Sequence, residues 1–251
     1  MTINQHVQYA RDYFGMPNIP GNIFEFITSK KNYIDVYNLV IFKEDLDKLS
    51  GFIGYEKSYA YICVNYQRSI GHQNLTLGHE LGHYFIHRGE LFSDKEVTTN
   101  CKSPIQEKEA FEFAIELLCP HKEFRDDIYN STLMDDLSSK KFLSIGSVIN
   151  DICHKYFLSF EVILRKILYE FQIPQKFDFY LNNIKDAIGG SLTYYDKDFY
   201  SPKCGIYSTP YRYPYDYLKS NVITAMNNGS IGKATGESIL FTYGLLGDEE
   251  N

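Results

Sequence analysis

The sequence predicts an α+β fold that is mostly helical, with a small antiparallel sheet and a distinct C-terminal segment. Apolar residues recur at helical spacing over much of the chain, whereas Ile, Val and Tyr concentrate in residues 33–64. A change in composition follows Pro174. We therefore expect a domain over residues 1–173, with a helical pair at 145–171, and a Tyr-rich segment over 174–251 that ends in short helices.

The size and charge of the chain limit what it can do. With 251 residues, of which 44% are hydrophobic, it can bury one good core and a second small one. The net charge of −7 argues against binding of a nucleic-acid backbone as the main role, because such binding needs Lys and Arg to displace counterions. We therefore expect a protein partner and do not expect direct nucleic-acid binding.

Several features predict a cytoplasmic location. The chain has no apolar run of about eighteen residues, so no membrane span is expected. The N-terminal stretch MTINQHVQYARDYFG lacks the basic and apolar regions of a secretory signal. The five cysteines are odd in number and contain no CxxC pair, which fits a reducing compartment. Cys63 and Cys119 lie in apolar runs and are expected to be buried thiols.

The first 65 residues are expected to form two helices and three strands. Helices are predicted over 3–14 and 22–30 from their apolar spacing. Strands are predicted over 33–42, 52–55 and 59–64, and the last two should form a hairpin. This arrangement predicts the small antiparallel sheet.

The stretch LTLGHELGHYFIH, residues 75–87, carries the clearest chemical signal. On a helix, residues four apart lie on one face, so His79 and His83 can turn ring nitrogens toward a single ion. Zinc takes nitrogen, sulfur or carboxylate ligands at about 2.0–2.3 Å, and a catalytic zinc keeps one position for water. Glu80 would face that water and accept its proton.

A helix predicted over residues 106–120, opened by Ser103-Pro104, offers a third ligand. Its apolar positions are expected to pack inward: Ala110, Phe111, Ala114, Leu117 and Leu118. Glu107 lies one turn before Phe111 on the same side, where a carboxylate is costly to bury unless a metal or a cation takes it up. The other acidic residues of this helix are interpreted as a solvated face: Glu109, Glu112 and Glu116.

Other residues of the first motif indicate how its helix is placed. Gly78 and Gly82 each cost about 1 kcal/mol against alanine in a helix, which predicts close approach of another backbone. Asn74 or Thr76 is expected to be the N-cap. His87 lies about 12 Å along the helix axis from the first histidine of the motif, too far for the same ion, and is expected to serve the helix C-terminus.

Three stretches together resemble the ImmA/IrrE family of metallopeptidases. They are ICVN at 62–65, LTLGHELGHYFIH at 75–87 and EKEAFEFAIELLCP at 107–120. The family pattern usually has Asn where this chain has Phe111, a departure that removes none of the candidate ligands.

The resemblance implies a zincin-like metallopeptidase domain over residues 1–173. It implies zinc as the cofactor, with His79, His83 and Glu107 as its ligands and Glu80 as the general base. It also implies a protein substrate, a helix-turn-helix repressor encoded by a mobile element and cleaved to relieve repression.

In a zinc peptidase, the strand before the metal helix can be an edge on which the substrate lies extended, and we assign this role to the strand over 59–64. Two alternatives to this function stay open. One is a non-catalytic zinc-fold regulator that binds a protein partner or DNA. The other is a peptidase that acts on short peptides.

The helical pair is predicted over 145–157 and 159–171, with the spacing of a helix-turn-helix. Only Arg165 and Lys166 are basic on its second helix, so packing or partner docking is favoured over DNA binding.

The C-terminal segment differs from the rest of the chain in its aromatic content. Residues 194–217 contain eight of the 22 tyrosines, which fits an interface, a cover over the cleft or packing on the body of the protein. Two short helices are predicted after it, over 216–227 and 233–241.

Overall fold

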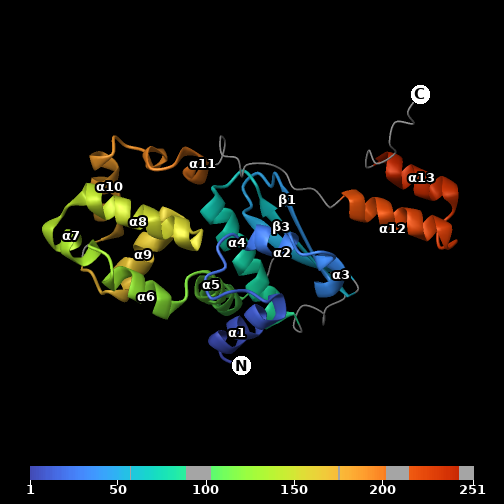
Figure 1. Ribbon diagram of the computed structural model, residues 1–251, viewed down its shortest axis with the longest axis horizontal. Coiled ribbons are helices and arrows are strands. Elements are labelled where there is room, and N and C mark those ends of the chain that lie inside the picture. Colours follow the sequence, from blue (N-terminus) through green and yellow to red (C-terminus); the bar gives the residue numbers. More distant parts are fainter. Residues whose placement is uncertain (57, 89–102, 175, 202–214, 243–251) are drawn as a thin grey trace.

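The computed structural model describes residues 1–56, 58–88, 103–174, 176–201 and 215–242, and it confirms the mostly helical α+β class. The first elements are α1 (Ile3–Phe14), α2 (Ile23–Thr28), α3 (Tyr33–Tyr37), β1 (Leu39–Glu44), β2 (Gly51–Glu56), β3 (Tyr59–Asn65), α4 (Ile70–Gly82), the π-helix η1 (His83–His87) and α5 (Pro104–Leu118). They are followed by α6 (His121–Tyr129), α7 (Leu133–Ser139), α8 (Phe142–Tyr156), α9 (Phe160–Glu170), α10 (Phe177–Ala187), η2 (Leu192–Tyr194), α11 (Lys197–Tyr200), α12 (Tyr215–Asn227) and α13 (Lys233–Thr242). In Figure 1, α4 and α5 lie in the middle, between the sheet and the helices α6 to α10.

The chain before the sheet forms one helix more than predicted. Both predicted helices are present as α1 and α2. The strand predicted over 33–42 is wrong in its first half, where α3 forms instead. Asn32 and Asn38 flank α3 with φ angles of 57° and 50°, a left-handed conformation that Asn tolerates better than most residues. These two residues turn the chain into and out of the short helix, so β1 begins only after Asn38.

The sheet is mixed rather than antiparallel. Its order is β1-β3-β2, in which β3 is antiparallel to β2, as the predicted hairpin requires, and parallel to β1. The antiparallel expectation is wrong for β1 because the chain crosses from β1 to the far side of the sheet, and the hairpin then returns β3 between the two. Cys63 on the central strand is fully buried as predicted.

Helix α4 begins earlier than predicted, after Ser69, and neither of the two predicted caps begins it. Asn74 is instead buried inside the helix. Its side-chain amide donates to the carbonyls of Gly21 and Phe157 at 2.9 and 3.1 Å and accepts from the N–H of Ile23 at 2.9 Å. The helix is thereby joined to the start of α2 and to the end of α8.

The predicted helical pair is present as α8 and α9, and Ser159 caps α9 as expected. Helix α10 packs against both. The two basic residues of α9 are engaged within the protein: the Arg165 guanidinium lies 3.7 Å from the centroid of the Phe177 ring, and Lys166 forms an ion pair with Glu170. These contacts favour a packing role for α9.

The two predicted C-terminal helices are present as α12 and α13, which pack against each other and lie at the right of Figure 1, away from the helical body. Most of the Tyr-rich segment, residues 202–214, lies outside the described residues. Earlier tyrosines pack on the body: Tyr195 stacks on Phe160 with centroids 6.3 Å apart, and the Tyr200 hydroxyl donates to Asn150 at 2.9 Å. None of the described helices is long and apolar enough to cross a bilayer.

Candidate metal centre

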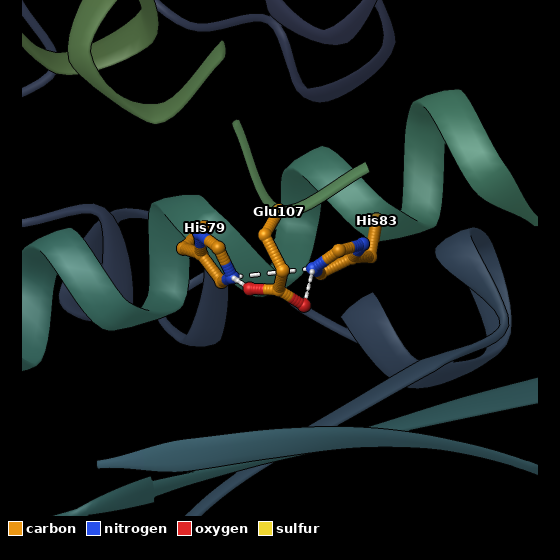
Figure 2. A group of neighbouring side chains, drawn as sticks. All are labelled: His79, His83 and Glu107. Carbon is orange, nitrogen blue, oxygen red and sulfur yellow. Dashed lines mark hydrogen bonds and ion pairs between the residues drawn. The ribbon is translucent and has the colours of Figure 1, made fainter. Parts of the chain in front are cut away.

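Two imidazoles face each other across one turn at the junction of α4 and η1. The Nε2 atoms of His79 and His83 lie 3.1 Å apart, and Figure 2 shows both rings on the same side of the helix. The side chain of His83 is 1% exposed and that of His79 is 20% exposed. Two ring nitrogens this close need a proton or a cation between them, so the pair is suited to ligating an ion.

Glu107 of α5 completes the cluster. Its Oε2 lies 3.1 Å from His79 Nε2, and its Oε1 lies 3.5 Å from His83 Nε2. Two ligand atoms that each stand about 2.0–2.1 Å from one ion in tetrahedral array are about 3.3 Å from each other, so the separations fit one small ion. Within the described residues, these three side chains form the group that could hold a metal ion. They are the three candidate ligands predicted from the sequence (Figure 2).

Close packing of α5 on α4 brings Glu107 into reach. A Cβ added to Gly82 would lie 2.8 Å from both the Cα and the carbonyl oxygen of Ala110, and one added to Gly78 would lie 3.3 Å from the Cβ of Ala114. Backbone and small side chains of α5 occupy the space that larger side chains on α4 would need. The reason predicted for the two glycines is therefore confirmed.

The inward face of α5 differs from the prediction at one position. Phe111 is 46% exposed, and Phe113 is fully buried in its place. The buried face of α5 includes Ala110, Phe113, Ala114 and Leu117, which recur at spacings of three and four. Position 111 lies outside this face. The departure from the family pattern at this position therefore lies on an exposed part of α5.

Glu80 follows the first histidine of the cluster and is only 4% exposed. A buried carboxylate is costly unless its surroundings compensate the charge. The charge of Glu80 acts on Tyr55 of β2. Burial is the main cause that raises the pKa of the Tyr55 hydroxyl. Tyr84 and Glu80 raise this pKa further, whereas Arg88 lowers it. Strand β2 is in contact with α4.

Two residues beside the cluster were missed by the sequence reasoning. His87 is 2% exposed rather than placed at a solvated helix end, and its Nδ1 lies 3.0 Å from His83 Nδ1. Its Nε2 lies 3.1 Å from Oε2 of Glu109, which was predicted to be a solvated residue. The signal that could have found this contact is the recurrence of histidine every four residues, at 79, 83 and 87.

The predicted role of the strand over 59–64 as a substrate edge is wrong. Both sides of β3 are paired, one with β1 and one with β2, so its backbone groups are already used in the sheet. Among the described strands, β1 and β2 each pair with β3 alone and are the two edges, and of these β2 makes the more extensive contact with α4.

The fold and the cluster define an α+β protein whose central helix carries two imidazoles one turn apart, with a carboxylate supplied by the next helix. Residues 34–168, just over half of the chain, match the family model of the IrrE N-terminal-like domain, and the chain belongs to this peptidase family. It is 32% identical over 91 residues to the protein named Metallopeptidase ImmA of Bacillus subtilis (strain 168). That match covers 35% of this chain and 52% of the relative, so the chain spans about half the length of this curated relative.

Proposed function

We propose that this chain is a zinc-dependent endopeptidase in which His79, His83 and Glu107 hold the ion and Glu80 is the general base. The observation that carries the proposal is the convergence of two imidazoles and a carboxylate beside a buried Glu80, in a chain of this peptidase family. A bound zinc ion would polarise a peptide carbonyl and lower the pKa of water to about 7.

The residues of the chain supply the remaining chemistry. His79 and His83 would hold the ion, and Glu107 would add a negative charge that offsets part of the charge of the cation. Glu80 accepts a proton from the attacking water and returns it to the nitrogen of the leaving amine. Because Glu80 is buried, its carboxylate is held by its surroundings, which suits proton transfer over a short and constant distance.

The outer side of β2 is the edge to which we assign the substrate. This strand pairs on one side with β3 and contacts α4. A peptide that added to this edge in extended form would be held by backbone hydrogen bonds, with little dependence on its sequence.

We further propose that the substrate is a regulatory protein in the cytoplasm, a helix-turn-helix repressor of a mobile element. Membership of this peptidase family and similarity to the relative named Metallopeptidase ImmA support a protein substrate. The choice of a repressor rests on the resemblance of the three sequence stretches to the ImmA/IrrE family. The net charge of −7 and the internal contacts of Arg165 and Lys166 favour a protein over DNA as the partner.

The variant Glu80→Gln tests the proposal, because it removes the proton acceptor and keeps the size of the side chain. New protein N-termini would be identified by mass spectrometry in cells that express the wild type or the variant, together with the zinc content and circular dichroism of both purified proteins. We expect a cut in a repressor with the wild type alone, with equal zinc content and equal folding in the two proteins. The same cut with both proteins, or a regulatory effect that Glu80→Gln retains, would contradict a hydrolytic role.

A further inference from the structure

A chain of hydrogen bonds continues from the proposed metal centre into the protein. The Nε2 atom of His83 faces His79 and Glu107, whereas its Nδ1 lies 3.0 Å from Nδ1 of His87. The other ring nitrogen of His87 lies 3.1 Å from Oε2 of Glu109. The side chains of His83 and His87 are 1% and 3% exposed, so water does not compete for the bond between them.

With both rings neutral, one arrangement of protons satisfies the contact between His83 and His87 and that between His87 and Glu109. An ionised carboxylate only accepts, so Nε2 of His87 donates to Glu109. The lone pair of His87 is then on Nδ1, where it accepts from Nδ1–H of His83. His83 is left with its lone pair on Nε2, which is the atom that faces the cluster.

We propose that His87 and Glu109 are positioning residues for the metal centre: Glu109, acting through His87, selects the tautomer of His83 that can ligate an ion and holds its ring. This inference rests on the proposed function. A metal-ligating histidine usually donates its second N–H to a carboxylate, a carbonyl or water, which fixes its tautomer and orientation. Here a second histidine is placed between the ligand and the carboxylate.

Local structure supports this role. The π-helix η1 begins at His83 and ends at His87, and such single π-turns are rare and are frequently found at functional sites. Glu107 and Glu109 are two residues apart on α5, so their side chains leave the helix in different directions. One contacts Nε2 of His83 and the other contacts His87. Helix α5 therefore contacts both histidines, His83 through Glu107 and His87 through Glu109.

Metal affinity provides the first test. The Kd for Zn²⁺ would be measured in the full chain by competition with a chelator, for wild type, Glu109→Ala, Glu109→Gln and Glu112→Ala. We expect about 10–100-fold weaker binding for Glu109→Ala, and a smaller loss for Glu109→Gln because an amide oxygen still accepts from His87. Glu112 pairs with Lys108 on the same helix, so Glu112→Ala is the matched control and should leave the Kd unchanged.

The tautomer of His83 provides a second readout that needs no metal. In ¹⁵N NMR spectra of the metal-free protein, we expect His83 to carry its proton on Nδ1 in the wild type and to populate both tautomers in Glu109→Ala. A purely structural role of Glu109 would not change this signal. Because Glu109 acts through His87, the double variant His87→Phe with Glu109→Ala should bind Zn²⁺ no more weakly than His87→Phe alone. Circular dichroism checks that each variant is folded.

An unchanged tautomer of His83 together with an unchanged Kd in Glu109→Ala would overturn the positioning role. Fully additive losses in the double variant would also contradict it, because residues acting in series are not additive. If the wild type does not bind Zn²⁺, the proposed function fails, and the NMR comparison of wild type with Glu109→Ala alone decides whether Glu109 sets the tautomer.

Discussion

Glu107 is held in place by the helix that carries it rather than by its own burial. Its side chain is 45% exposed, more than that of either imidazole it faces. A pair between exposed charges contributes little to stability, so a contact with one histidine would not by itself explain its position. Because each carboxylate oxygen faces a different ring nitrogen, the arrangement fits a cation shared by the three side chains.

We expect Glu107→Gln to lose bound zinc while keeping its fold, because the amide retains the shape of the side chain and removes the charge of a ligand. The affinity for zinc should fall by more than the about 10–100-fold that is typical when a residue contacting a metal ligand, rather than the metal, is changed. Elemental analysis of the purified protein measures the zinc content. Glu112→Gln on the same helix should keep its zinc, and equal zinc content in Glu107→Gln and wild type would remove Glu107 from the ligand set.

The contact between α4 and α5 determines whether the cluster can form. The candidate ligands come from two helices separated by a long segment of chain, and the backbone of Ala110 lies against Gly82 between them. Helices that pack through glycine approach more closely than helices separated by larger side chains, so Glu107 reaches both imidazoles from the first turn of α5. The glycines of the motif therefore contribute through packing, although their helix propensity is poor.

Gly82→Ala should separate the two helices, because its Cβ would lie 2.8 Å from the Ala110 backbone. We expect about 1–3 kcal/mol of lost stability, as for other overpacked positions, together with weaker zinc binding. Urea unfolding and zinc titration measure the two effects. Gly78→Ala, at 3.3 Å from its nearest neighbours, should be milder, and Gly54→Ala on β2, with no heavy atom within 4 Å, is the control. Equal stability of all three variants would refute the packing argument.

At the scale of the whole molecule, Asn74 joins parts of the fold that are distant in sequence. From inside α4 it contacts Gly21 and Ile23 at the start of α2 and Phe157 at the end of α8. Each of its amide atoms therefore has a backbone partner in a buried place, where an unsatisfied group is costly. The helical pair is thereby fixed relative to the helix that carries the candidate ligands.

We expect Asn74→Ala to destabilise the protein by about 1–3 kcal/mol or more, because it leaves buried backbone groups of three segments without their partner. The free energy of unfolding in urea, measured by circular dichroism, tests this. Asn183 donates to the Phe179 carbonyl on an exposed part of α10, so Asn183→Ala is a matched control and should have little effect. A similar free energy for the two variants would show that Asn74 does not join the segments.

Much of the fold and of the candidate site follows from local patterns. Helices α1, α2, α8, α9, α12 and α13 and the β2–β3 hairpin lie where periodicity and caps predict them. The wrong predictions concern relations between elements. The place of β1 beside β3, the exposure of Phe111 and the contact of Glu109 with His87 each depend on what packs against the element.

The sequence by itself determined that His79 and His83 lie on one helix face with Glu80 between them, because the period of a helix is a local property. It also determined that Glu107 lies in the first turn of the next helix. Only the tertiary structure decided that Glu107 and Glu109 of that helix contact the histidines. It also decided that β3 is the central strand and that β2 is an edge strand in contact with α4. These contacts join residues far apart in the chain, and the packing of α5 and of the sheet on α4 sets their geometry.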